Sequence, residues 1–177
     1  MIGGAVNMLG FLSASMAATT QRFMSYSEGS GNFEDKKQVF NVSMMLHFII
    51  AVCACILLCS FSYLFFDKII NIPIERLYAA KVVYYSMVFS VVITVLSVPY
   101  DAVINSHENM LYYSIVGIID SFGKLTIAVY ITTFVSGDKL IVYGILMAAL
   151  SIAVMMAMQI YCHKHYPCLL YTSPSPR

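Results

Sequence analysis

An aspartate and a lysine stand inside an otherwise apolar stretch, Met110–Val135. Asp120 and Lys124 are four residues apart, a spacing that brings two side chains together on one face of an α-helix. Where such a helix crosses a membrane, ionisable groups at this depth are costly and usually face a bundle interior or a wet cavity. The pair is therefore predicted either to neutralise itself and hold helices together, or to line a path for a polar molecule.

A second group of candidates follows a proline at the end of another apolar run. Pro99 removes a backbone donor and bends its helix. Asp101 is then either a carboxylate at a hinge near the membrane border or a cap for the coming turn. His107 and Glu108 lie in the polar turn Asn105–Asn109. We expect these two side chains to form an exposed tip, because a proton relay through them would require their burial.

Arg22 is a candidate for binding an anion. Its guanidinium group suits phosphate or pyrophosphate, although an arginine at a membrane border also commonly extends to lipid headgroups. His47 lies within an apolar run and is interpreted as a core histidine rather than a ligand. The cysteines of that run are interpreted as small apolar fillers, so neither a metal site nor a disulfide framework is predicted.

Several classes of function are disfavoured by what the sequence contains. It has no glycine-rich phosphate loop, no nucleophile elbow and no spaced set of metal ligands, so we predict no catalytic residue, no cofactor and no enzyme. The formal net charge is +1 and no basic stripe is present, which argues against a nucleic-acid partner.

Composition favours a membrane protein whose partner is the lipid bilayer. Hydrophobic residues make up 60% of the chain and charged residues 11%, against roughly 45–50% and about 25% in soluble domains. The apolar runs predict an all-α membrane protein with five transmembrane helices in up-down hairpins. We place these helices at about residues 1–24, 42–66, 76–104, 110–135 and 140–162.

The first predicted helix carries small residues on one face. Gly10, Ala14 and Ala18 recur every fourth residue, as in closely packed membrane helices. A secretory signal peptide is disfavoured because no lysine or arginine precedes the apolar stretch. Lysine and arginine are balanced between the two sides, so charge does not determine the orientation. Five helices and a weak first one predict a partial bundle, residues 1–167, within a larger protein.

The last ten residues differ in composition from the apolar runs before them, because serine and proline alternate at their end. Cys168–Arg177 matches, residue for residue, the in-frame translation of a transposase-type sequencing adapter, TGTCTCTTATACACATCTCCGAGCCCACGA. We therefore expect residues 168–177 not to be native and the natural protein to continue past Pro167. A disordered Ser/Pro tail is the alternative.

Several motifs, taken in order and spacing, resemble those of bacterial polysaccharide and lipopolysaccharide biosynthesis flippases. These proteins belong to the multidrug/oligosaccharidyl-lipid/polysaccharide exporter superfamily. The resemblance covers Met1 to about Pro167 and rests on the following segments: Ile2–Ser13, Ala18–Phe23, Asn71–Arg76, Ser97–Ala102, His107–Met110, Asp120 with Lys124, and Asp138–Tyr143.

The resemblance implies a transporter of two helical bundles that moves an undecaprenyl-pyrophosphate-linked glycan across the bacterial inner membrane by alternating access. It implies that the five helices are the second to sixth of the N-terminal bundle, and that the Glu28–Lys37 loop and the Asn105–Asn109 turn are cytoplasmic. Arg22, Asp120 and Lys124 are then the candidates for the substrate path. Asp101 departs from the asparagine expected in the family, which weakens any requirement for charge there.

Three alternatives stay open. A cation-coupled drug exporter of the same superfamily would need acidic residues in its cavity and a coupling ion. A membrane-embedded glycan polymerase or transferase would need long periplasmic loops that carry arginine or carboxylates, and the loops expected here are short. The fragment by itself is expected to be inactive, because half a transporter cannot alternate access.

Overall fold

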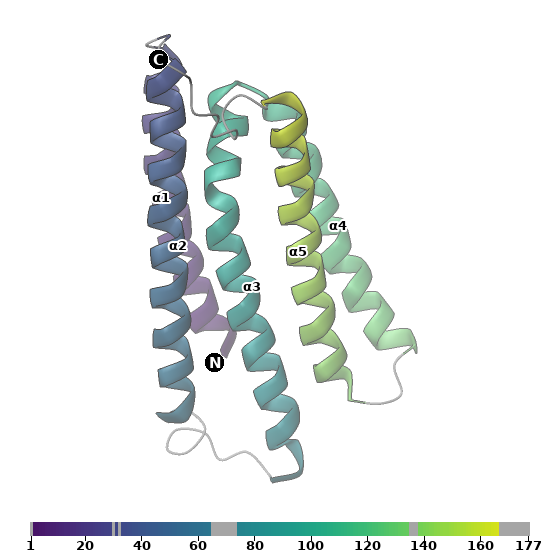
Figure 1. The fold of residues 1–177 in the computed structure, drawn as a ribbon. Coiled ribbons are helices and arrows are strands. Elements are labelled where there is room, and N and C mark those ends of the chain that lie inside the picture. Colours follow the sequence, from purple (N-terminus) through teal and green to yellow (C-terminus); the bar gives the residue numbers. More distant parts are fainter. Residues whose placement is uncertain (1, 30, 32, 65–73, 135–137, 167–177) are drawn as a thin grey trace.

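The chain folds into five antiparallel helices (Figure 1). The structure is a computed structural model that describes the backbone of residues 2–29, 31, 33–64, 74–134 and 138–166, and within these ranges the side chains from residue 15 onward except those of residues 33, 63–64 and 74–76. The helices are α1 (Ile2–Gly29), α2 (Phe33–Leu64), α3 (Ile74–Ser106), α4 (Met110–Phe134) and α5 (Lys139–His165). The described residues contain no strand, so the predicted all-α fold is confirmed.

Four of the helices are long and apolar enough to cross a membrane. The qualifying segments are Glu34–Ser62, Leu77–Ser106, Met110–Phe134 and Lys139–His165. The side chains of α1 are described only from Ser15, a stretch shorter than the roughly 20 residues that a span needs. The fifth span therefore stays a prediction. The expected adapter segment, residues 168–177, lies outside the described residues.

The helices α1, α2 and α3 extend beyond the apolar runs that predict them. The first ends at Gly29 rather than near residue 24, and α2 begins at Phe33 rather than near residue 42. Polar residues continue a helix readily once it leaves the hydrocarbon, and Glu34 with Asp35 adds favourable charge to the first turn of α2. The expected Glu28–Lys37 loop is consequently much shorter than predicted.

Helix α3 occupies the centre of the bundle. It packs against α1, α2 and α5, whereas α4 lies chiefly against α5 (Figure 1). The α3–α5 contact is close at Gly144, where an added Cβ would lie 3.2 Å from the Cα of Val83. The main core cluster lies toward the end of the bundle where α1, α3 and α5 finish, and its buried members are Met24, Phe40, Tyr100, Val103, Ile104, Val116, Met158 and Cys162.

Side-chain bonds at that same end join the α3–α4 turn to α5. The Asn109 amide donates a hydrogen bond of 2.6 Å to the Tyr161 hydroxyl. The Tyr161 ring stacks on Tyr112 of α4 with 3.6 Å between centroids, and the Tyr112 hydroxyl donates to the Ala157 carbonyl at 2.9 Å. Buried polar tips with defined partners fix the register of α4 against α5.

Candidate functional site

A cavity of about 260 Å³ lies between α3, α4 and α5. Three charged side chains line it: Asp101 from α3, and Asp120 and Lys124 from α4. Sequence spacing predicted that Asp120 and Lys124 would share a helix face. The structure adds Asp101 to them, because α3 and α4 both pack against α5 and enclose the space between them.

Asp120 and Lys124 form an ion pair within α4. The Lys124 Nζ atom lies 2.7 Å from the Asp120 Oδ2 atom. The side chains are 28% exposed for Asp120 and 52% exposed for Lys124. The two side chains therefore neutralise each other, which is one of the two roles predicted for them. Their position on the cavity is compatible with the second role, which is to line a path for a polar molecule.

Asp101 has a different environment. Its Oδ1 atom is buried and has no hydrogen-bond partner among the described residues. Thr94, Ser97 and Asp101 are spaced by three and four residues and line the cavity from one face of α3. The expectation that Asp101 caps the following turn is not supported, because α3 continues past it to Ser106.

The serine and threonine hydroxyl oxygens that line the cavity are available as hydrogen-bond acceptors, because each hydroxyl donates its proton to a backbone carbonyl. Ser97 donates its proton to the Thr94 carbonyl at 2.8 Å, and Ser151 donates to Met147 at 3.0 Å. Thr94 donates to the Ser90 carbonyl at 2.9 Å. A hydroxyl has one proton and two lone pairs, so each oxygen keeps acceptor capacity. The sequence analysis did not single out these residues, although serine and threonine within apolar runs were the available signal.

The balance of charge in the cavity is negative. Two carboxylates face one ammonium group, and the hydroxyl oxygens add acceptor capacity. A buried charge without a partner is costly, so this arrangement is suited to taking up a proton or a small cation.

Pro99 lies just before Asp101 and is fully buried. Helix α3 continues through it, so the Val95 carbonyl faces a ring nitrogen that has no proton to donate. The backbone of α3 is therefore weakened one turn before the carboxylate. The predicted hinge stays a prediction that this arrangement makes physically reasonable.

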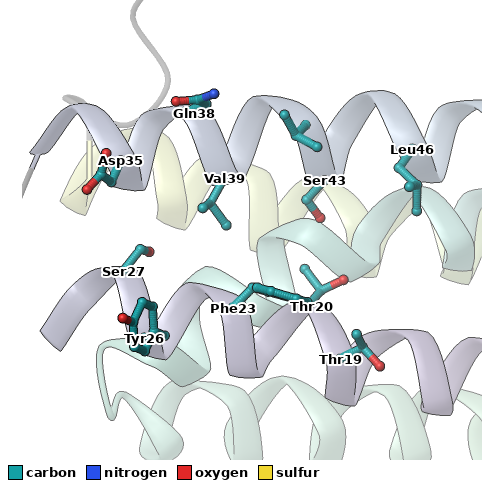
Figure 2. A pocket seen from close by; sticks show the side chains of 11 residues that line it. Thr19, Thr20, Phe23, Tyr26, Ser27, Asp35, Gln38, Val39, Ser43 and Leu46 are labelled. Carbon is teal, nitrogen blue, oxygen red and sulfur yellow. The ribbon is translucent and has the colours of Figure 1, made fainter. Parts of the chain in front are cut away.

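Arg22 does not reach the cavity. Its side chain is exposed on α1, and it is not among the residues that line the space around Lys124. A separate groove of about 620 Å³ runs between α1 and α2. Figure 2 shows two of its polar side chains, Thr20 and Ser43, pointing into the gap between the two helices. Arg22 does not line that groove either.

His107 differs from the exposed tip that we expected. Its side chain is only 21% exposed, and its Nε2 atom lies 3.5 Å from Glu28 Oε2 on α1. The reason is that α1 extends to Gly29 and so reaches the α3–α4 turn. Glu108 is exposed as predicted, with a backbone φ of 55° that places it in the left-handed region.

His47 is a core residue, as interpreted from the sequence, with 1% of its surface exposed. Its Nδ1 atom lies 2.8 Å from the Ser43 carbonyl, whereas Nε2 is buried without a partner among the described residues. No group of three histidine, cysteine or acidic side chains capable of holding a metal occurs in the described part of the chain.

The family model described as MatE matches residues 3–128, more than half of the sequence. This chain belongs to the MatE family. The matched segment includes the three charged residues of the cavity. MatE proteins are part of the exporter superfamily named above and are transporters rather than enzymes. The chain is accordingly a multi-pass membrane protein of a transporter family. Searches of curated proteins and of solved structures found no significant match.

Proposed function

We propose that the chain is part of an ion-coupled flippase that moves a lipid-linked oligosaccharide across the bacterial inner membrane by alternating access. The observation that carries the coupling is the cavity between α3, α4 and α5, where the buried Oδ1 atom of Asp101 has no hydrogen-bond partner among the described residues and lies beside the Asp120–Lys124 pair. Uptake and release of a proton or small cation there would change the charge at the centre of the bundle.

The choice of substrate rests on the sequence motifs that resemble polysaccharide flippases. Their physical task is to shelter a polar, anionic headgroup while the lipid tail stays in the bilayer. Lys124 is the candidate for the anionic group, because its side chain is half exposed beside the cavity and its ion pair with Asp120 can be exchanged for one with phosphate. Arg22, exposed on α1, is a second and separate candidate.

The proposal also includes an orientation. The α1–α2 turn, the α3–α4 turn and the end of α5 lie together at the upper end of the bundle (Figure 1). By the resemblance, this end faces the cytoplasm. The opposite end, with the N-terminus of α1, would face the periplasm.

A cation-coupled multidrug exporter is the second candidate. Two carboxylates on one cavity, Asp101 and Asp120, are the observation that favours it. A glycan polymerase or transferase is less favoured, because the connections proposed to face the periplasm are only nine residues long between α2 and α3 and four between α4 and α5, which leaves little chain for a catalytic loop.

Complementation tests the proposal. The complete gene, continued past the Pro167 codon in genomic DNA, is expressed in a strain that lacks its own lipid-linked oligosaccharide flippase. Restored surface glycan with unchanged drug susceptibility is expected. If the glycan is not restored and drug resistance increases, at a normal level of membrane protein, the flippase assignment is wrong and the multidrug exporter is favoured.

A further inference from the structure

A cluster of charged and aromatic side chains joins four helices at the upper end of the bundle. Glu28 at the end of α1 contacts Lys36 of α2 at 2.7 Å through Oε1 and His107 after α3 at 3.5 Å through Oε2. The His107 ring packs on the Tyr166 ring at the end of α5, with 4.1 Å between centroids. This cluster is distinct from the cavity between α3, α4 and α5 and shares no residue with it.

Both ring nitrogens of His107 face hydrogen-bond acceptors. Its Nδ1 atom lies 2.9 Å from the Val103 carbonyl oxygen, which accepts a hydrogen bond and cannot donate one. Its Nε2 atom faces the Glu28 carboxylate. A neutral imidazole carries one N–H and satisfies one of these acceptors, whereas the imidazolium ion satisfies both. The Tyr166 ring face adds a favourable contact for a cation.

The remaining groups around His107 do not replace this interaction. The charged and titratable groups that contact it among the described residues are Glu28 directly, Lys36 through Glu28, and Tyr166. Ser106 lies beside Nδ1 at 3.3 Å and is neutral, and α4 begins with the apolar Met110. Lys36 holds Glu28 in either protonation state of the histidine, so only the link from α1 to α3 depends on the proton.

We propose that His107 and Glu28 form a proton-operated latch that fastens the α1–α2 turn to the α3–α4 turn. Histidine is the side chain that ordinarily changes charge between about pH 5 and pH 8. Protonated His107 bridges Glu28 and the Val103 carbonyl and closes the latch. Deprotonation removes the charge attraction and leaves one N–H, which the closer Val103 carbonyl at 2.9 Å retains, so the Nε2 lone pair faces Glu28 and the latch opens. The Glu28–Lys36 pair keeps α1 and α2 together. The latch does not depend on which substrate is moved.

The test measures the distance between the two turns in the full-length protein in lipid nanodiscs. Spin labels are placed at Gly29→Cys, where an added Cβ meets nothing within 4 Å, and at Leu111→Cys, which is 72% exposed. The other cysteines are replaced by serine. A single short distance is expected near pH 5, with a longer population that grows several-fold toward pH 8.

Three variants decide the result. His107→Gln and Glu28→Gln should each give a distance distribution that no longer changes with pH, and Glu28→Gln should favour the longer distance throughout. His163→Gln is the matched control, because His163 also bonds a carbonyl one turn earlier through Nδ1, at 3.0 Å from Gln159 O, and is exposed; it should respond as the parent does. Should His107→Gln not fold, Glu28→Gln carries the same test.

Two outcomes overturn the latch. One is a parent protein whose distance distribution is unchanged across the whole pH range. The other is a response to pH that survives in either His107→Gln or Glu28→Gln. Neither outcome bears on complementation by the complete gene, so failure of the latch and failure of the flippase proposal are distinguishable.

Discussion

Asp101 and Lys124 line the same cavity from two different helices, yet Lys124 pairs with Asp120 and leaves the Asp101 Oδ1 atom without a partner. One lysine thus stands beside two carboxylates in a cavity between membrane-spanning helices. The unequal distribution makes Asp101 the group whose charge is least compensated. It is the position at which a change in charge should have the largest effect.

We expect Asp101→Asn to stabilise the protein and to uncouple it. A neutral amide is cheaper to bury than a carboxylate without a partner, so the free energy of unfolding should rise by about 1–3 kcal/mol. Transport should lose its dependence on the ion gradient. Thermal melting in detergent and gradient-driven uptake into vesicles measure the two effects.

Asp138→Asn is the matched control for Asp101→Asn. Asp138 is exposed before α5, and its side chain makes no capping hydrogen bond. Its substitution should leave both melting and coupling unchanged. A lower melting temperature for Asp101→Asn with intact coupling would contradict the role assigned to this carboxylate.

Lys124→Met separates a structural ion pair from a transport residue. Because Asp120 is only 28% exposed and loses its partner inside a membrane-crossing helix, we expect the substitution to lower the stability of the protein, so transport is scored per amount of membrane protein. Transport should fall strongly, since Asp120 is left unpaired in the cavity and no cation remains there. Complementation scored against membrane protein level is the measurement.

The control for Lys124→Met is Lys139→Met, an exposed lysine at the start of α5, which should behave as the parent does. Full transport by Lys124→Met at normal protein level would show that the pair only holds the helix surface together. Transport regained by the double variant Asp120→Asn, Lys124→Met would point to charge balance rather than to the lysine itself.

Gly144→Ala should destabilise the α3–α5 contact. The added Cβ would lie 3.2 Å from the Val83 Cα and 3.2 Å from the Ser86 Cβ, so two helix backbones must separate, at a cost of about 1–3 kcal/mol. Gly117→Ala is the comparison, because an added Cβ there meets nothing within 4 Å. It should melt at or slightly above the parent temperature. Equal melting temperatures for the two variants would show that α3 and α5 are less closely packed than described.

Pro99→Ala tests the hinge in α3. The substitution supplies an N–H group to the Val95 carbonyl and completes the helix. We expect slower amide hydrogen exchange around residues 95–99, a lower transport rate and unchanged substrate binding. Hydrogen-exchange mass spectrometry and a transport assay on the same preparation measure these quantities. Slower exchange with an unchanged transport rate would show that the proline is not used as a hinge.

The helices were predictable because each one that crosses the membrane must hide its backbone from hydrocarbon, which leaves long apolar runs in the sequence. The Asp120–Lys124 pair was predictable for a similar reason, since an i,i+4 spacing is a local property of one helix. The length of the helices beyond the membrane was not predictable in this way. Polar residues there, such as Glu28 and Lys36, are compatible with either a loop or a helix.

The joining of distant residues could not be predicted from the sequence. Asp101 meets the α4 pair only because α5 holds α3 and α4 on either side of one space, and no local spacing encodes that arrangement. Likewise, His107 contacts Glu28 because α1 ends level with the α3–α4 turn. Arg22 is the opposite case. Its guanidinium group is suited to binding an anion, but the fold places it on an exposed face of α1, away from the cavity.

The four described cysteines differ in their surroundings, and this difference has a practical consequence. Cys162 is buried and lies 3.8 Å from the Tyr100 carbonyl, whereas Cys53 and Cys59 are exposed on a helix that crosses the membrane. Since only the thiolate reacts, a membrane-permeant maleimide applied at a pH high enough to ionise thiols should modify Cys53 and Cys59 before Cys162, which stays unmodified until the bundle unfolds. The rate at which Cys162 is alkylated therefore measures the rate of unfolding, and this measurement needs neither transport nor substrate.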